Sequence, residues 1–151
     1  MTKTINGLMY LNMLRGGARN LGANRAAVND LNVFPIPDGD TGDNMFMTID
    51  AGASKTAESA LLPCRYRQRC VILSRIFAGI GKGLESEKEA DIARFIFALQ
   101  QGVGEAYRAV SNPVEGTILT VYREAVETVT KEDPDSFEAL FDVMLRELAA
   151  S

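Results

Sequence analysis

Residues 92–110 read IARFIFALQQGVGEAYRAV, and their apolar side chains recur at steps of three and four residues. That spacing places these side chains along one side of an α-helix, which is typical of a helix packed against a core. The stripe consists of Ile92, Phe95, Ile96, Leu99, Val103, Ala106, Tyr107 and Val110. The stretch therefore predicts an amphipathic helix, and its period is the one to look for in the rest of the chain.

The same period continues on both sides of this stretch. Pro113 and Pro134 interrupt it, and a proline ends one helix or opens the next. Sustained strand-type alternation of apolar and polar residues is missing. The sequence therefore predicts an all-α fold with seven helices, at about 3–19, 23–31, 44–57, 70–84, 89–110, 115–130 and 135–149.

Length and charge narrow the class of protein. The chain has 151 residues, which suits one domain over 1–151, and no linker divides it. Its net charge of -4 argues against a nucleic-acid partner. No apolar run reaches the roughly 20 residues of a membrane span. With no secretory signal at the start, we expect a cytoplasmic protein.

The residue types also limit the chemistry. Cys64 and Cys70 are expected to be free thiols in a reducing compartment. The sequence has no histidine, which excludes Ser-His and Cys-His catalysis as well as most zinc sites. Chemistry in this chain must therefore use carboxylates, backbone amides, Lys, Arg or a bound metal.

One non-helical stretch, LNVFPIPDGDTGDNM at residues 31–45, carries such groups. Its two prolines exclude helix, and its two glycines permit tight turns. Asp38 and Asp40 are close enough in sequence for both carboxylates to meet at one Mg²⁺ or Ca²⁺ ion. The residues after them lead into a helix, whose first N–H groups attract phosphate. Together these features predict a magnesium–nucleotide site.

Other kinds of loop share some of these features. An isolated Asp-Gly-Asp is more often a solvated turn than a metal site. An EF-hand calcium loop starting at Asp38 would need Gly and Glu where Asp43 and Ile49 stand. A Walker-type phosphate loop is absent, because no Gly-Lys-Ser/Thr follows a glycine-rich run.

Two longer motifs make the interpretation more specific. Residues 32–42, followed by Asn44-Met45, resemble the signature of the DhaL superfamily, and residues 113–121 resemble a second motif of the same family. Shorter matches lie at 5–7, 17–21, 71–74 and 81–84, so the resemblance covers about residues 5–130. Within the superfamily, the chain is most similar to the N-terminal ATP-binding domain of bacterial fatty acid kinase.

This resemblance implies an up-and-down antiparallel helical barrel that holds Mg²⁺ and ATP or ADP at one end. It implies Asp38, Asp40 and Asn32 as magnesium ligands. It also implies a set of nucleotide-binding residues, namely Thr41, Gly42, Asn44, Gly116 and Thr117. From the residues alone, Gly116-Thr117 would be a helix-start turn after Pro113.

The resemblance further implies transfer of the γ-phosphoryl group to a fatty acid carboxylate that a separate acyl-binding protein presents. A carboxylate is already a nucleophile at neutral pH, so positioning and charge neutralisation can carry the step without a catalytic base. The alternative is a dihydroxyacetone-type kinase subunit. Those subunits usually read Asp-Gly-Asp-His-Gly where this chain has Thr41 in place of the histidine.

Two departures from the family favour a third interpretation. The family carries a glycine-rich phosphate loop before Val71, whereas residues 64–70 here read CRYRQRC. The family's domain also continues past the position of Ser151, so we expect a barrel truncated at its C-terminus, closed by dimerisation or by its last helix. A degenerate module that binds metal or nucleotide weakly without turnover therefore stays an alternative, as does an interaction domain with a relic loop.

Overall fold

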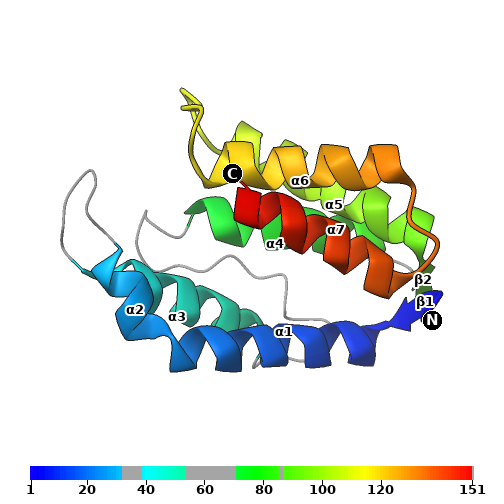
Figure 1. Ribbon diagram of the computed structural model, residues 1–151, viewed down its shortest axis with the longest axis horizontal. Coiled ribbons are helices and arrows are strands. Elements are labelled where there is room, and N and C mark those ends of the chain that lie inside the picture. The colour runs from blue at the N-terminus through cyan, green and yellow to red at the C-terminus, as the bar shows by residue number, and fades with distance from the viewer. Residues whose placement is uncertain (32–38, 54–70, 86, 151) are drawn as a thin grey trace.

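A computed structural model describes residues 1–31, 39–53, 71–85 and 87–150 of the chain, and in these ranges the fold is helical (Figure 1). These described ranges contain seven helices: α1 (Gly7–Ala23), α2 (Arg25–Asp30), α3 (Thr41–Ala53), α4 (Val71–Leu84), α5 (Ile92–Arg108), α6 (Ile118–Glu132) and α7 (Phe137–Ala150). The only strands in these ranges are β1 (Thr4–Asn6) and β2 (Glu89–Asp91), which form one small antiparallel sheet. The predicted all-α class is confirmed.

The two strands correct two predicted helix starts. The helices expected at 3–19 and 89–110 begin instead at Gly7 and Ile92, because the residues before them pair as β1 and β2. Ile5 lies opposite Ala90 in the register, and both side chains are buried. Each strand then leads directly into a helix whose first turn is capped by the side chain of the last strand residue.

Smaller differences concern the other helix ends. α3 begins at Thr41 rather than at 44, and the end predicted for it at 57 lies outside the described ranges. α6 begins at Ile118 rather than at 115, because the turn after Pro113 continues to its N-cap, Thr117. Helix ends depend on capping contacts that the apolar period does not encode.

The main core lies among α4, α5, α6 and α7, where consecutive helices pack on one another. α4 and α5 approach most closely at Gly79 and Gly83. A Cβ atom built on Gly79 would lie 2.4 Å from the carbonyl oxygen of Gln101. Phe95 of α5 lies at the centre of an aromatic cluster and makes edge contacts with Phe137 and Phe141 of α7.

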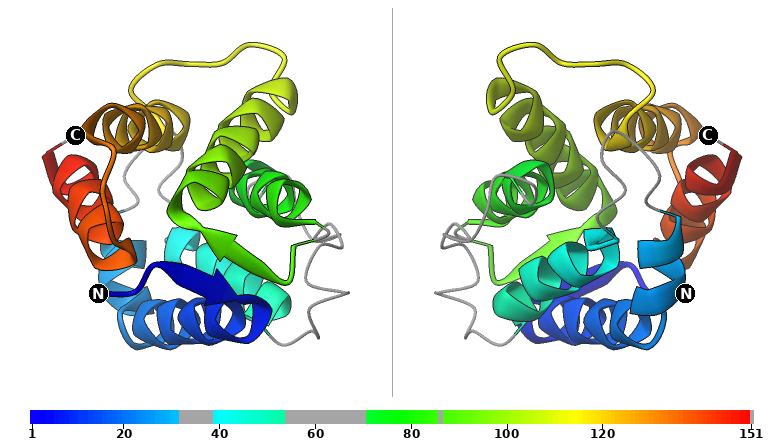
Figure 2. Two further views of the ribbon diagram at one scale, coloured as in Figure 1. Left: turned by 90° about the vertical axis from the view of Figure 1, so that its right-hand side faces the viewer. Right: turned by 90° about the vertical axis from the view of Figure 1, so that its left-hand side faces the viewer.

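The first three helices form a second group. α1 packs on α3, and α2 packs on the start of α3. Viewed along the long axis in Figure 2, α1 and α3 lie at one side, and α4 to α7 follow as an arc that returns to the N-terminus. Ala18 is the only buried residue of α1, whereas α5 has six buried residues. α1 is therefore packed less deeply than α5.

Hydrogen bonds join the N-terminal residues to the start of α7. The N–H of Phe137, the first residue of α7, donates to the carbonyl oxygen of Thr2 at 3.0 Å. The N–H and hydroxyl of Thr2 donate to the carboxylate of Glu138. Hydrogen bonds from the N–H of Glu138 itself and from Thr2 hold the pKa of this carboxyl below its ordinary value. None of the helices described here is long and apolar enough to cross a bilayer.

Candidate functional site

The predicted metal loop is described from Gly39 onward. Asn32 and Asp38, two of the three predicted magnesium ligands, lie outside the described ranges, as do residues 64–70. Asp40, Thr41, Gly42, Asn44, Gly116 and Thr117 are all described. The structure therefore places one of the predicted ligands and all five predicted nucleotide-binding residues.

Asp40 stands immediately before α3. Its carbonyl oxygen accepts the first hydrogen bond of the helix, from the N–H of Asn44 at 2.9 Å. Gly39 precedes it with a φ of 62°, a left-handed conformation that favours glycine. This turn places the half-buried Asp40 beside the positive end of the helix dipole, where a carboxylate is favourable.

The start of α3 is capped from another helix. The side-chain oxygen of Asn29, in α2, accepts hydrogen bonds from the N–H groups of Gly42 at 2.7 Å and Asp43 at 3.3 Å. Asn29 also donates to the carboxylate of Asp43, and Arg25 forms an ion pair with the same carboxylate at 3.3 Å. Two amides that the sequence predicted for phosphate are therefore used within the fold, and an incoming phosphate would have to share or displace Asn29.

Gly42 has a packing role at this junction. A Cβ atom at position 42 would lie 2.5 Å from the carbonyl oxygen of Arg25, so only glycine lets α2 approach α3 this closely. Asn44, two residues further on, is buried, and its carbonyl oxygen accepts a hydrogen bond from the hydroxyl of Thr48. Thr41 is half-buried at the start of the helix.

Asn29 and Arg25 were missed by the sequence interpretation. Both lie in a stretch predicted to be an ordinary helix, and nothing in the spacing of residues 23–31 marks one side of it as facing position 42. The contact depends on how the chain returns after residue 38, which the local pattern does not contain. A polar residue near a glycine-rich turn is too common to serve as a signal.

The second motif forms the connection from α5 to α6. Thr117 is the N-cap of α6: its hydroxyl accepts from the N–H of Leu119 and donates to the carbonyl oxygen of Val114 at 2.9 Å. Gly116 has a φ of 76°, and its N–H donates to the hydroxyl of Thr120 at 2.9 Å. This geometry is that of a helix-start turn, and it leaves Gly116 exposed.

The two motifs lie at the same end of the molecule. Figure 1 shows the start of α3 and the α5–α6 connection at its left end, together with the start of α4. Figure 2 shows that they are on different sides of that end, with the connection above and α3 below. The structure thus brings Asp40 and Gly116-Thr117 to one end without merging them into a single turn.

The acidic groups here also limit how a metal could be held. Within the described ranges, no three side chains among His, Cys, Asp and Glu gather closely enough to hold a metal ion. A cation at this loop would draw on residues outside those ranges, as the predicted pair of Asp38 and Asp40 does. That donor set, two carboxylates with the amide oxygen of Asn32, consists of hard oxygen atoms and fits Mg²⁺ chemically.

Comparison with known proteins adds an independent observation. Residues 69–151 match the DAK2 domain. Over 165 aligned residues the chain is 38% identical to Protein YloV of Bacillus subtilis, covering 99% of this chain and 30% of that protein. It is 39% identical over 165 residues to an uncharacterized protein of Staphylococcus epidermidis, again with 30% of the relative covered. The chain therefore spans about a third of the length of these relatives.

Proposed function

This chain belongs to the DAK2 domain family, the DhaL type, and from that membership we propose that it is the Mg–nucleotide-binding module of a kinase. The match covers the helices from α4 to α7 and begins two residues before α4. The start of α3, which follows the predicted metal loop in the sequence, lies before that region but at the same end of the molecule as the α5–α6 connection, which lies within it (Figure 1). This shared end is the observation that carries the proposal.

In the proposed site, Mg²⁺ would be held by Asp38 and Asp40, with Asn32 as a further oxygen ligand. The ion would neutralise charge on the phosphate oxygens of ATP or ADP. Thr41 and Asn44 would position the phosphates from the first turn of α3, and Gly116-Thr117 would border the nucleotide from the α5–α6 connection. The contribution of the protein is then position and charge rather than a base.

The acceptor that we propose is a fatty acid carboxylate presented by an acyl-binding partner protein. Its oxygen would attack the γ-phosphorus of ATP and form an acyl phosphate, while ADP leaves. This step needs no proton acceptor, because the attacking carboxylate is already ionised at neutral pH. The absence of histidine from the sequence is therefore compatible with this phosphoryl transfer.

A second candidate is a module that binds Mg–nucleotide without turnover. The observation that favours it is the sequence CRYRQRC at 64–70, directly before α4, where the resembled family has a glycine-rich phosphate loop. The glycines of that loop let the backbone adopt positive φ and come close to phosphate, and none of them is kept in residues 64–70.

The binding part of the proposal is tested by calorimetric titration of ADP with and without Mg²⁺. Asp40→Asn is expected to weaken Mg-dependent binding at least tenfold, which corresponds to about 1.4 kcal/mol, because a charged oxygen ligand is lost. Asp142→Asn, on the exposed side of α7, removes the same charge away from the site and is expected to leave binding unchanged. Equal binding by all three proteins would refute the site.

Turnover separates the two candidates. Transfer of labelled γ-phosphate from ATP to a fatty acid, measured with an acyl-binding protein present, would establish the kinase. Mg-dependent ADP binding with no transfer to a fatty acid or to a small hydroxy-ketone would establish the non-catalytic module instead.

A further inference from the structure

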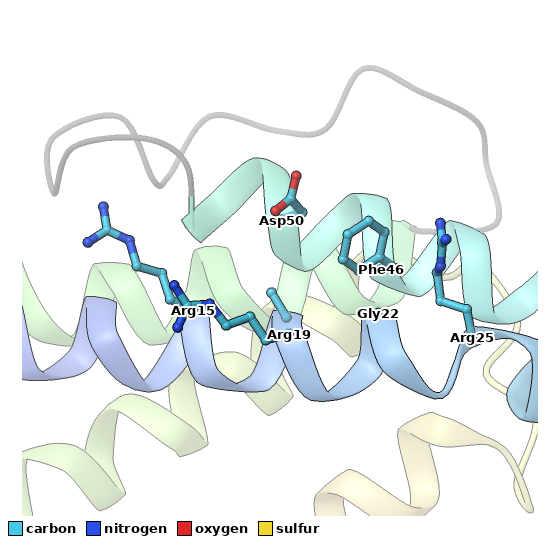
Figure 3. A pocket seen from close by; sticks show the side chains of 7 residues that line it. Arg15, Arg19, Gly22, Arg25, Phe46 and Asp50 are labelled. Atoms are coloured by element: carbon cyan, nitrogen blue, oxygen red, sulfur yellow. The ribbon is translucent and has the colours of Figure 1, made fainter.

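A hollow of about 660 Å³ lies between α1 and α3 and reaches Arg25 beside the start of α3. Its walls carry an unusual concentration of positive charge for a chain of net charge -4. The side chains that matter are those of Arg15, Arg19, Arg25, Phe46 and Asp50, with Gly22 on the wall formed by α1 (Figure 3). Among the described residues that line the hollow, three are arginines and one is a carboxylate.

The two ends of the hollow differ. Arg25 is held in place, because its guanidinium lies 5.0 Å from the centre of the Phe46 ring and pairs with Asp43 at 3.3 Å. Phe46 in turn rests against α1, where a Cβ atom on Gly22 would approach its ring to 2.9 Å. This end is a fixed wall built from an aromatic ring and a glycine.

The other end presents donors. Arg15 and Arg19 are four residues apart on α1, so they lie one above the other on the same side of the helix. Both are exposed, and Figure 3 shows them side by side at one end of the hollow, with Asp50 on α3 above. Each guanidinium offers a planar fork of N–H donors that matches two oxygens of a phosphate group.

We propose that this hollow is a phosphate-binding site, in which Arg15 and Arg19 hold a phosphate or diphosphate group beside the Phe46–Arg25 wall. The hollow, its charge and the arginine spacing support this site independently of the proposed function. The Arg25–Asp43 ion pair lies between the hollow and the start of α3. The ligand is a small phosphorylated molecule, and its phosphate could belong to a nucleotide or to another phosphate compound.

The test is a calorimetric titration of the full chain with inorganic pyrophosphate, without Mg²⁺, at low and at physiological salt. Arg19→Gln and Arg15→Gln are each expected to weaken pyrophosphate binding about tenfold. Arg19→Lys is expected to weaken it less, because lysine keeps the positive charge but lacks the planar pair of N–H donors of a guanidinium. The matched control is Arg146→Gln, an exposed arginine of α7 that pairs with Glu132 and Glu147. An unchanged melting temperature in each variant shows that the fold is retained.

Three results would overturn the proposal. The first is equal weakening by Arg146→Gln, which would mean that pyrophosphate responds to overall charge and not to the hollow. The second is no difference between the wild type and the two hollow variants. The third combines a lowered melting temperature of Arg19→Gln with unchanged pyrophosphate binding by Arg19→Lys and Arg15→Gln. It would assign these arginines to helix packing.

Failure here can be told apart from failure of the nucleotide site. Asp40→Asn is expected to keep pyrophosphate binding while it weakens Mg-dependent ADP binding, so each site can fail without the other. Competition between the two ligands on the wild type distinguishes the sources of the phosphate. If saturating ADP displaces pyrophosphate, the hollow takes the nucleotide's own phosphates. If both bind together, the hollow serves a second phosphorylated compound.

Discussion

Gly42 gives the clearest residue-scale test of how the loop motif is built. Its neighbour Gly39 needs a left-handed backbone, but Gly42 is required because α2 passes against it. Gly42→Ala is expected to destabilise the protein by about 1–3 kcal/mol, since the added methyl meets the carbonyl oxygen of Arg25 and backbone must move. Urea unfolding of the variant measures the loss.

The matched control for this substitution is Gly17→Ala. Gly17 lies inside α1 with nothing within 4 Å of its added Cβ, so alanine there is expected to be neutral or to stabilise by about 0.5–1 kcal/mol. Equal destabilisation by the two variants would mean that the tight contact at Gly42 does not hold in solution.

At this scale the sequence predicted some roles and could not predict others. The position of Asp40 before a helix followed from local spacing, because Pro37, Gly39 and the apolar period after them all act within a few residues. The cap from Asn29 could not be predicted, since it joins residues that are brought together by the path of the intervening chain. Asn32 and Asp38 keep the role the resemblance gives them as a proposal.

At the scale of elements, the α4–α5 pair depends on glycine at the contact. Gly79→Ala is expected to cost more than about 2 kcal/mol, because its Cβ would meet the backbone at Gln101 and neither helix can yield locally. Gly104→Ala, on the same pair but with only the flexible end of Arg108 nearby at 3.7 Å, is expected to stabilise α5. Thermal unfolding of both variants provides the measurement, and a similar melting temperature for the two would contradict this account of the packing.

The helices themselves were predictable because their signal is local. An apolar side chain every three or four residues specifies a helix wherever it occurs, and α4 to α7 lie close to the predicted ranges. β1 and β2 were not predictable, because three residues are too few to show alternation and each strand exists only through the other. Asn6 and Asp91 cap the following helices, but neither could be distinguished from an interior helical residue before the pairing was known.

For the whole molecule, the uneven distribution of buried side chains predicts uneven stability. α5 buries six residues, whereas α1 buries one and α2 buries none. Native-state hydrogen exchange is therefore expected to show α1 and α2 opening at a lower free energy than α5, as a separate cooperative unit. Uniform protection across the helices would show instead that the first three helices and the core unfold together.

The residue patterns alone did not predict how the helices are arranged in space. They predict how many helices form and which side of each is apolar, whereas the arc from α3 round to α7 came as an expectation of the family resemblance. The family membership agrees with that expectation, and the order of packing, α4 on α5, α5 on α6 and α6 on α7, follows the order of the chain. Short connections between consecutive helices favour such neighbours.

The fastening of Thr2 to the start of α7 has a consequence for how the protein is made. Thr2 is synthesised well before its hydrogen-bond partners in α7, since Glu138 follows it by 136 residues. At roughly 5–20 residues per second, that interval is on the order of ten seconds. During that interval β1 can pair with β2 once residues 89–91 have been made, whereas Thr2 has no partner in α7. The contact that joins the first residues to α7 therefore forms only after α7 itself has been synthesised.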